Sequence, residues 1–317
     1  MPSEDLHFMD QLEDLGKPTV AKKAWMEDVD LILATAESLD EIEKEALASG
    51  RCALDLETTG LNQRAFPNDQ GRLITQDKIV GFCFAATVKR AYYVPVRHRE
   101  LGAHANVPVR LVVDLINRLQ SKGVVFIFHN AKFDTKFLAC EPAGAAGEWD
   151  DPAKWEDTLA MAYLRNSRER QKGLKYLSKK SPDDEYPGLG REMIELGDLY
   201  LKEKGKKIDK DFSLLDPTWE PVVWYAAADA LNTLALYELL RPVIMEQDKF
   251  GRTQKTVYTI EKVCLIATQW MEQCRIYIDR KKLTHLIQTG QQEWWDSIQD
   301  VYSAVSATLD RDIRPPW

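Results

Sequence analysis

Cysteine is scarce in this sequence, and long apolar runs are absent. Five cysteines occur in 317 residues, an odd number, and no two of them form a C-x-x-C pair. This pattern argues against a disulfide framework and a structural zinc site, and it predicts small, buried, apolar side chains. No segment approaches the ~18 apolar residues of a membrane-spanning helix. The acidic start, residues 1–14, lacks the apolar core of a secretory signal. The sequence therefore predicts an intracellular protein without a membrane partner.

Positive charge is also in deficit. Lys and Arg number 42 against 50 Asp and Glu, which gives a net charge of −8. This balance argues against broad binding to duplex phosphates, but not against an enzyme that grips one strand end with the help of metal ions. Two basic groups stand out, one within residues 165–180 and one within residues 202–210. The first is the better candidate for phosphate contact, and it consists of Arg165, Arg168, Arg170, Lys172, Lys175, Lys179 and Lys180.

Apolar periodicity and turn residues predict the elements. Residues 1–37 are acidic and irregular, and Ser38 and Glu41 form a capping-box pattern before a short helix that Gly50 ends. Strands are expected at 51–56, 79–87, 90–96 and 124–128. Helices are expected at 39–48, 109–119, 159–164, 174–180, 189–202 and 221–240, with two long helices after Thr256 that split near 275–279. Residues 140–154 read as a surface insertion.

The order of these elements indicates the fold class. Strands come first as a hairpin-like group and then alternate with helices, which predicts an α/β fold with a mixed β-sheet flanked by helices. We divide the chain into an acidic N-terminal segment with a short helix (1–49), a main domain (50–245) and a helical C-terminal extension (246–317).

Acidic residues fall where three of the expected elements begin or end. Asp55 and Glu57 lie two apart at the end of a strand, so their side chains point to one face. Asp134 opens a helix after a buried strand. Tyr225 and Asp229 lie one turn apart on a helix, and the alanines between them leave room for close approach. Taken singly, each acid could be a solvated strand end, a helix-dipole partner or a surface residue.

Together the four acids are a more specific signal. Carboxylates gathered in one pocket repel each other unless cations lie between them. Hard oxygen ligands favour Mg²⁺ or Mn²⁺, and a pair of such ions can clamp the attacking and leaving oxygens of a phosphodiester. The sequence therefore predicts a site for two divalent metal ions.

The motifs DLETTGLN, HNAKFD and YAAAD resemble the three exonuclease motifs of the proofreading domain of family A (Pol I-like) DNA polymerases. That domain belongs to the DEDD, or DnaQ-like, ribonuclease H-like superfamily, and tyrosine in the third motif marks the DEDDy branch. The segments DTLAMAYL and GLKYL are similar to further stretches of the family, so the resemblance covers about residues 50–240. A weaker likeness to the start of the polymerase region follows at Glu261 and residues 271–279, where Cys274 and Arg275 depart from the family pattern.

The resemblance implies an activity and roles for residues. It implies metal-dependent 3′→5′ hydrolysis of DNA ends to nucleoside 5′-monophosphates, as in proofreading, in the cytoplasm of a bacterial or phage-infected cell. Asp55, Glu57, Asp134 and Asp229 would hold the ions, and Tyr225 would orient the attacking water. Thr58 and Leu61 would contact the terminal nucleotide, and Asn130 would help to hold the strand, although local turn packing explains Thr58 and Leu61 equally well. Asp157 has a structural interpretation, as the N-cap of the helix at Leu159.

Two other functions fit the same motifs. One is a ribonuclease D-like RNA exonuclease. The other is a catalytically inactive domain that holds DNA for a polymerase, although loss of activity normally removes at least one acid and all four are here. The expected partners are a single-stranded or frayed DNA 3′ end and a polymerase domain or separate polymerase subunit, which the C-terminal helices could dock.

Overall fold

A computed structural model describes residues 17–63, 66–67, 73–74, 76–200, 211–247, 251, 253–274, 279–309 and 314. The chain forms two compact units, Met1–Gln269 and Trp270–Trp317. The second basic group of the sequence, within 202–210, lies outside the described residues.

A six-stranded mixed sheet forms the centre of the first unit. In spatial order its strands are β1 (Asp30–Leu33), β6 (Arg90–Pro95), β5 (Ile79–Thr87), β2 (Arg51–Thr58), β7 (Val125–Phe128) and β8 (Trp155–Asp157). The pairs β2–β5 and β5–β6 are antiparallel, while β1–β6, β2–β7 and β7–β8 are parallel. Two short strands, β3 (Phe66–Pro67) and β4 (Leu73–Ile74), pair separately. The four expected strands and the mixed sheet are confirmed.

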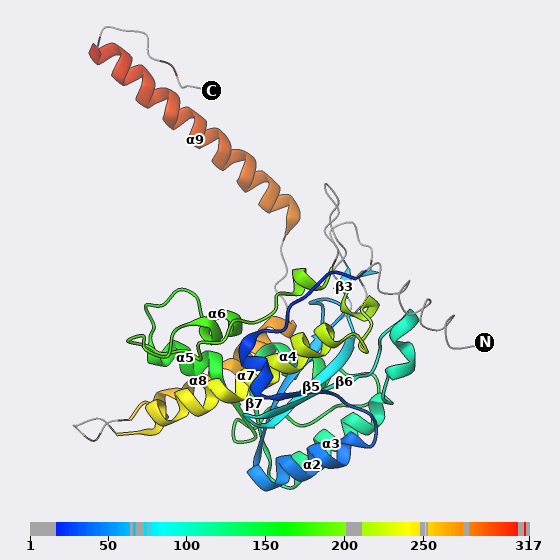
Figure 1. Cartoon of the computed structure of the whole chain (residues 1–317). Helices are drawn as coiled ribbons and strands as arrows, with labels where there is room; N and C mark the ends of the chain where they lie inside the picture. The colour runs from blue at the N-terminus through cyan, green and yellow to red at the C-terminus, as the bar shows by residue number, and fades with distance from the viewer. Residues whose placement is uncertain are drawn as a thin grey trace. The chain divides into compact units, whose positions relative to one another are not determined.

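Helices cover both faces of the sheet, with α2 and α3 on one side and α7 on the other (Figure 1). The α-helices are α2 (Ser38–Ser49), α3 (Val109–Ser121), α4 (Ala131–Ala139), α5 (Thr158–Arg165), α6 (Leu174–Lys179), α7 (Glu220–Met245), α8 (Lys255–Cys274) and α9 (Arg280–Leu309). Short 3-10 helices are η1 (Ala24–Asp28), η2 (Glu100–Ala105), η3 (Leu196–Leu199) and η4 (Phe212–Leu214). This arrangement is the ribonuclease H-like fold that the motifs predicted.

Alternation along the strands creates two cores, one on each face of the sheet. On β2, Cys52, Leu54 and Leu56 face the core shared with α2 and α3, whereas Ala53 faces the core shared with α7. Because side chains two apart share a face, Asp55 and Glu57 lie on the α7 side. The buried apolar strands explain why 79–87 and 124–128 read as nearly continuous apolar runs.

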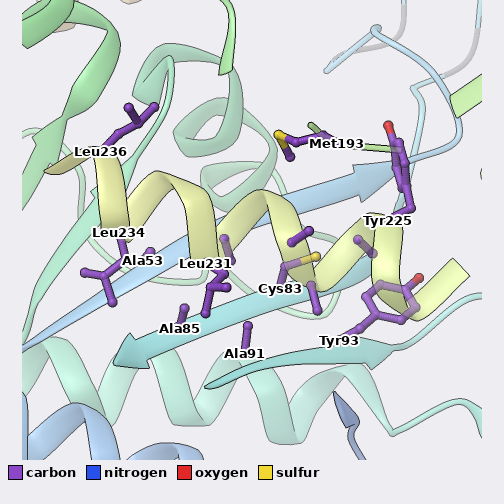
Figure 2. Close-up of a cluster of buried hydrophobic side chains, with 14 of the residues drawn as sticks. Ala53, Cys83, Ala85, Ala91, Tyr93, Met193, Tyr225, Leu231, Leu234 and Leu236 are labelled. Atoms are coloured by element: carbon purple, nitrogen blue, oxygen red, sulfur yellow. The ribbon is translucent and has the colours of Figure 1, made fainter. Parts of the chain in front are cut away.

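Small side chains bring α7 close to the sheet. Figure 2 shows Ala53, Ala85 and Ala91 on the strands that lie beneath this helix. On the helix itself Ala226, Ala227 and Ala228 are all buried. The alanines between Tyr225 and Asp229 thus allow the close approach of the sheet, and this packing holds α7 next to the end of β2.

The N-terminal segment is more regular than predicted. Residues 24–28 form η1, and β1 adds a parallel strand beside β6. The four-residue strand is too short to give a clear alternation in the sequence. The capping box is also wrong, because Glu37 is the N-cap and makes no side-chain cap bond. The Ser38 hydroxyl instead accepts a hydrogen bond from the Thr35 backbone N–H at 3.1 Å. Gly50 does end the helix, in a left-handed conformation with φ 69°.

The helix expected at 189–202 is wrong over its described part. Only Leu196–Leu199 is helical there, as the 3-10 helix η3, and residues 201–202 are not described. The chain before it folds back on α6, since the Gly190 N–H donates to the Lys180 carbonyl and the Arg191 N–H donates to the Ser178 carbonyl. Gly190 has φ 65°, which a helix cannot use. Tertiary pairing therefore overrides the helical periodicity.

Residues 140–154 form neither helix nor strand, as expected of an insertion, but they are not confined to the surface. Trp149 is buried, and its ring lies 5.5 Å from that of Phe126 and 5.3 Å from that of Phe128. The insertion thus closes the core beside β7. Cys52 and Cys83 are buried as predicted, whereas Cys264 is exposed.

Most of α8 belongs to the unit that contains the sheet. Tyr258 is buried, and the Lys262 ammonium donates to the Pro152 and Trp155 carbonyls at 2.7 and 3.0 Å. The second unit contains α9, which exposes Trp294 and other apolar side chains. The domain boundary expected after residue 245 stays a prediction, and it falls at the end of α7. None of the helices that the structure describes combines the length and apolarity needed to cross a lipid bilayer.

Candidate active site

The end of β2 carries the first two acids of the site. Asp55 lies directly opposite Cys83 of β5 in the antiparallel register, and Glu57 lies opposite Gly81. One ligand atom each from Asp55, Glu57 and Cys83 lie within 4.8 Å of one another. Strand alternation and cross-strand pairing therefore bring two carboxylates and a thiol together on the face covered by α7. The Cys83 thiol was not predicted at this site, because the sequence does not show which residue of β5 lies opposite Asp55.

The first turn of α4 carries the third acid. Asp134 is 2% exposed, and hydrogen bonds from its own backbone and from that of Leu56 act on its carboxylate. The bond to Leu56 ties α4 to β2 between the positions of Asp55 and Glu57. The Asp134 carboxylate therefore lies within the electrostatic reach of both strand acids.

The long helix α7 carries the fourth acid and the tyrosine. Tyr225 and Asp229 are one turn apart, and the Tyr225 ring packs 5.8 Å from that of Phe212 in η4. Among the described residues, no hydrogen-bond partner reaches the buried Asp229 Oδ1 atom. A buried carboxylate oxygen without a donor is costly, so this atom points to a ligand.

The electrostatics of the acids show that they share one environment. Burial raises the pKa of Asp55 well above its usual range, and the negative charge of Asp229 adds to the effect. Burial is also the largest cause of the raised pKa of Glu57, followed by the charge of Asp55. Burial raises the pKa of Asp134, again with a contribution from Asp55, and raises that of Asp229 to about 6. The four predicted acids thus lie within electrostatic reach of one another, while among the described residues the group whose ligand atoms lie within 4.8 Å consists of Asp55, Glu57 and Cys83.

Divalent cations fit this pocket by three observations. The donor set is dominated by carboxylate oxygens, which suit Mg²⁺ and Mn²⁺. Asp229 Oδ1 has no hydrogen-bond partner in the described part of the chain, and the acids raise each other's pKa, as expected where cations normally lie between them. Asp55, Glu57, Asp134 and Asp229 are the residues that would hold such ions.

Lys175 was not singled out as a site residue by the sequence, although it belongs to the first basic group. Its ammonium lies 4.4 Å from the centre of the Tyr225 ring and donates to the Ile194 carbonyl at 2.8 Å. Its charge lowers the pKa of Asp55, Glu57 and Asp229, against the larger effect of burial on each. Its place beside α7 follows from the packing of α6 on α7 and from Ile194, which lies in the segment where the expected helix 189–202 did not form.

The three residues expected to bind substrate are placed differently from one another. The Thr58 hydroxyl donates to the Gly60 carbonyl at 2.7 Å, which is a turn contact. Leu61 is 75% exposed, so its side chain is free to meet a ligand. Asn130 is the N-cap of α4 in a left-handed conformation, with φ 75°, and makes no side-chain cap bond. Their roles toward a nucleotide stay predictions.

Asp157 joins two helix N-termini. Its carboxylate accepts hydrogen bonds from the Leu159 and Ala160 N–H groups of α5, which confirms the predicted N-cap. It also accepts from the Asn130 and Ala131 N–H groups at the start of α4, at 3.1 and 3.0 Å. The second pair was not predicted, because no spacing in the sequence connects residues 130 and 157. Asp157 thereby fixes the helix that carries Asp134.

A buried histidine supports the aromatic packing behind Tyr225. His98 Nδ1 lies 2.6 Å from the Leu215 carbonyl, which can only accept, so Nδ1 carries the proton and Nε2 accepts from the Tyr93 hydroxyl at 2.6 Å. The His98 ring also packs 5.8 Å from that of Phe212. Burial lowers the pKa of His98 to about 4, so the neutral form is the folded one.

This shift predicts a pH-dependent contribution to stability. The folded-state pKa lies below the usual 6.5, so the stabilisation is complete above pH 6.5 and is lost as the pH falls toward 4. The stability advantage of the wild type over His98→Gln should shrink by about 3 kcal/mol between pH 7.5 and pH 4. Urea unfolding of both proteins across this range measures it, and a constant difference would contradict the assignment.

A ribonuclease H-like fold with grouped acids at the end of β2 and on α7 is typical of nucleases. A family model described as 3′-5′ exonuclease (DNA_pol_A_exo1) matches residues 31–245. The chain therefore belongs to this 3′-5′ exonuclease family. It is also 24% identical over 304 residues to a DNA polymerase of Bacillus phage SP01, a match that covers 89% of this chain and 30% of the polymerase. The chain thus spans about a third of the length of that relative.

Three solved structures are similar to this chain over most of its length. Brucella melitensis NrnC is 17% identical, with a TM-score of 0.42, over 73% of this chain and 91% of that one. The catalytic core of RRP6 from Trypanosoma brucei is 16% identical, with a TM-score of 0.44, over 79% and 54%. Pol1 of M. smegmatis is 16% identical, with a TM-score of 0.42, over 89% and 38%.

Proposed function

We propose that this chain is a 3′-5′ exodeoxyribonuclease that uses two divalent metal ions, Mg²⁺ or Mn²⁺, to release nucleoside 5′-monophosphates from DNA ends. The observation that carries the proposal is the group of four carboxylates that raise one another's pKa, one of which, Asp229, has an oxygen (Oδ1) without a hydrogen-bond partner among the described residues. The choice of DNA is supported by the match to a phage DNA polymerase. Proofreading for a polymerase, in the same chain or as a separate subunit, is the corresponding biological role.

The residues of the pocket have distinct tasks in this reaction. Bound divalent ions would supply the positive charge that activates water and stabilises the leaving oxygen. The four carboxylates would hold these ions. Burial and the neighbouring acids raise the pKa of Tyr225 well above its usual range, so its phenol keeps its proton and orients the water rather than acting as a base. The exposed Leu61 can wedge against the terminal base, whose stacking is cheapest to disrupt at a frayed end.

Digestion of a 5′-labelled oligonucleotide tests the proposal. With Mg²⁺ the DNA should shorten from its 3′ end as a ladder, and a chelator should stop the reaction. A matched single-stranded RNA tests the ribonuclease D-like alternative, because faster degradation of RNA would overturn the DNA assignment. Absence of shortening of either strand with Mg²⁺ or Mn²⁺ would favour the inactive, DNA-holding domain.

Tyr225→Phe should reduce activity without abolishing it. The carboxylates keep their charge in this variant, so only the orientation of water is lost, and we expect a decrease of about 10- to 100-fold in kcat. Tyr237→Phe is the matched control, since Tyr237 is also buried on α7 but packs near Arg51, and its kcat should be unchanged. A loss in Tyr225→Phe as large as in an Asp55 variant would mean that the hydroxyl has a larger role.

A further inference from the structure

We propose that Lys175 is a positioning residue of the exonuclease site, a fixed counter-cation that offsets the repulsion of the carboxylates and holds Tyr225 in place before divalent ions bind. This inference deepens the proposed function and rests on it for the part that concerns metal ions. It concerns a residue on α6, an element that carries none of the four acids.

The geometry holds the lysine from three sides. Its ammonium donates to the Ile194 carbonyl at 2.8 Å, pairs with Glu195 at 3.3 Å and lies 4.4 Å from the centre of the Tyr225 ring. A cation at that distance over an aromatic face is attracted by the ring, which restricts both partners. The tyrosine cannot rotate away without losing the contact.

The segment that supplies the carbonyl is itself fixed. Ile194 is buried, and Glu195 begins η3 with a reciprocal capping box in which the Asp198 side chain accepts from the Glu195 N–H at 3.1 Å. The return of this segment onto α6 uses two further backbone bonds, from Gly190 and Arg191. The Lys175 side chain is thus only 26% exposed and is fixed by protein contacts. The side chain of Lys179 on the same helix is 71% exposed.

The charge of Lys175 reaches the acids as well as the tyrosine. Its ammonium lies 4.4 Å from the centre of the Tyr225 ring, and Tyr225 is one helical turn from Asp229, so its charge also reaches Asp229 on α7 and Asp55 and Glu57 on β2. In a pocket with so much negative charge, one fixed cation lowers the cost of gathering the carboxylates. The same cation repels incoming metal ions, so its removal should destabilise the metal-free protein more than the metal-bound protein.

The first test compares Lys175→Met with the control Lys179→Met. Each protein is unfolded thermally in EDTA and in saturating Mn²⁺. For Lys175→Met we expect the Tm in EDTA to fall by about 3–6 °C and the Tm in Mn²⁺ to fall by less than half of that. Mn²⁺ binding, measured by electron paramagnetic resonance, should tighten about 3- to 10-fold. Equal Tm losses in the two media with unchanged Mn²⁺ binding would show a merely structural lysine and overturn the inference.

A double-mutant cycle makes the test independent of metal binding. In EDTA, Lys175→Met should lower the Tm in the wild-type background but have less than half that effect in Asp229→Asn, where one of the repelling charges is gone. Additive effects in a protein that degrades DNA would overturn the inference alone. The wild type could instead fail to bind Mn²⁺ and to shorten DNA while the Lys175 and Asp229 substitutions remain coupled. That result would overturn the proposed function and leave the role of Lys175 intact.

Kinetics separate positioning from substrate binding. With 5′-labelled single-stranded DNA, Lys175→Met should lower kcat about 10-fold or more while KM stays within about threefold. Lys44→Met, at an exposed lysine of α2 on the other face of the sheet, should change neither. A raised KM with unchanged kcat would assign Lys175 to phosphate binding instead, and would contradict the positioning role.

Discussion

Asp229→Asn should abolish the exonuclease activity and, at the same time, make the metal-free protein more stable. Loss of one metal-holding carboxylate removes several kcal/mol of transition-state stabilisation, which corresponds to a decrease in kcat of at least about 10³-fold. Burial raises the pKa of Asp229 to about 6, above its usual 3.8. The ionised carboxylate is therefore a cost to the folded state at neutral pH, and its removal should raise the free energy of unfolding by up to about 3 kcal/mol at pH 7.5 in EDTA.

The sign of this effect separates an active-site acid from a structural one. Because the cost vanishes below the unfolded pKa, the gain from Asp229→Asn should disappear as the pH falls below about 4. Mn²⁺ should stabilise the wild type and have little effect on the variant. Asp55→Ala should lose the same activity with its fold intact, as judged by circular dichroism. Wild-type turnover in either variant would refute the assignment of the site.

Asp157→Ala should have the largest effect on stability. The carboxylate is 1% exposed and accepts from four backbone N–H groups, at the starts of α4 and α5. Its removal uncaps two helices and leaves buried donors without partners, each at about 1–3 kcal/mol. We expect the free energy of unfolding to fall by about 3–5 kcal/mol in urea titrations.

An exposed aspartate provides the control for this prediction. Asp151 also accepts from a backbone N–H, that of Ala153 at 2.9 Å, but it lies on the surface. Asp151→Ala should cost less than about 1 kcal/mol. Similar losses of stability in Asp157→Ala and Asp151→Ala would contradict the claim that Asp157 stabilises the fold by capping both α4 and α5. Activity in Asp157→Ala should fall as well, since α4 carries Asp134.

The acids could be predicted from the sequence because local rules fix their positions. The spacing of Asp55 and Glu57 at a strand end, and of Tyr225 and Asp229 on a helix, determines which side chains share a face. The motifs around them carried the family resemblance, which the match over residues 31–245 confirms. The four strands of the six-stranded sheet between residues 51 and 128 could also be predicted, because burial on both faces makes them rich in apolar residues.

Other parts depended on contacts that no local pattern contains. The short strands β1 and β8 form only beside β6 and β7, and residues 190–191 bond back to the end of α6 in place of the helix expected from residue 189. Cys83 lies beside the acids through its register with Asp55, and Lys175 lies beside Tyr225 because α6 packs on α7 and its ammonium donates to the Ile194 carbonyl. Asp157 was recognised as one cap but not as two, since its second partner lies 27 positions away.

The number of Mn²⁺ ions bound per chain is the most direct test of the central claim. Titration of the metal-free protein, followed by the electron paramagnetic resonance of free Mn²⁺, should give two bound ions at neutral pH. Asp55→Asn and Asp229→Asn should each lose at least one of them, while Asp151→Ala keeps both. A wild type that binds no Mn²⁺ in this range, or binding that survives both active-site substitutions, would contradict a metal site built from these four carboxylates.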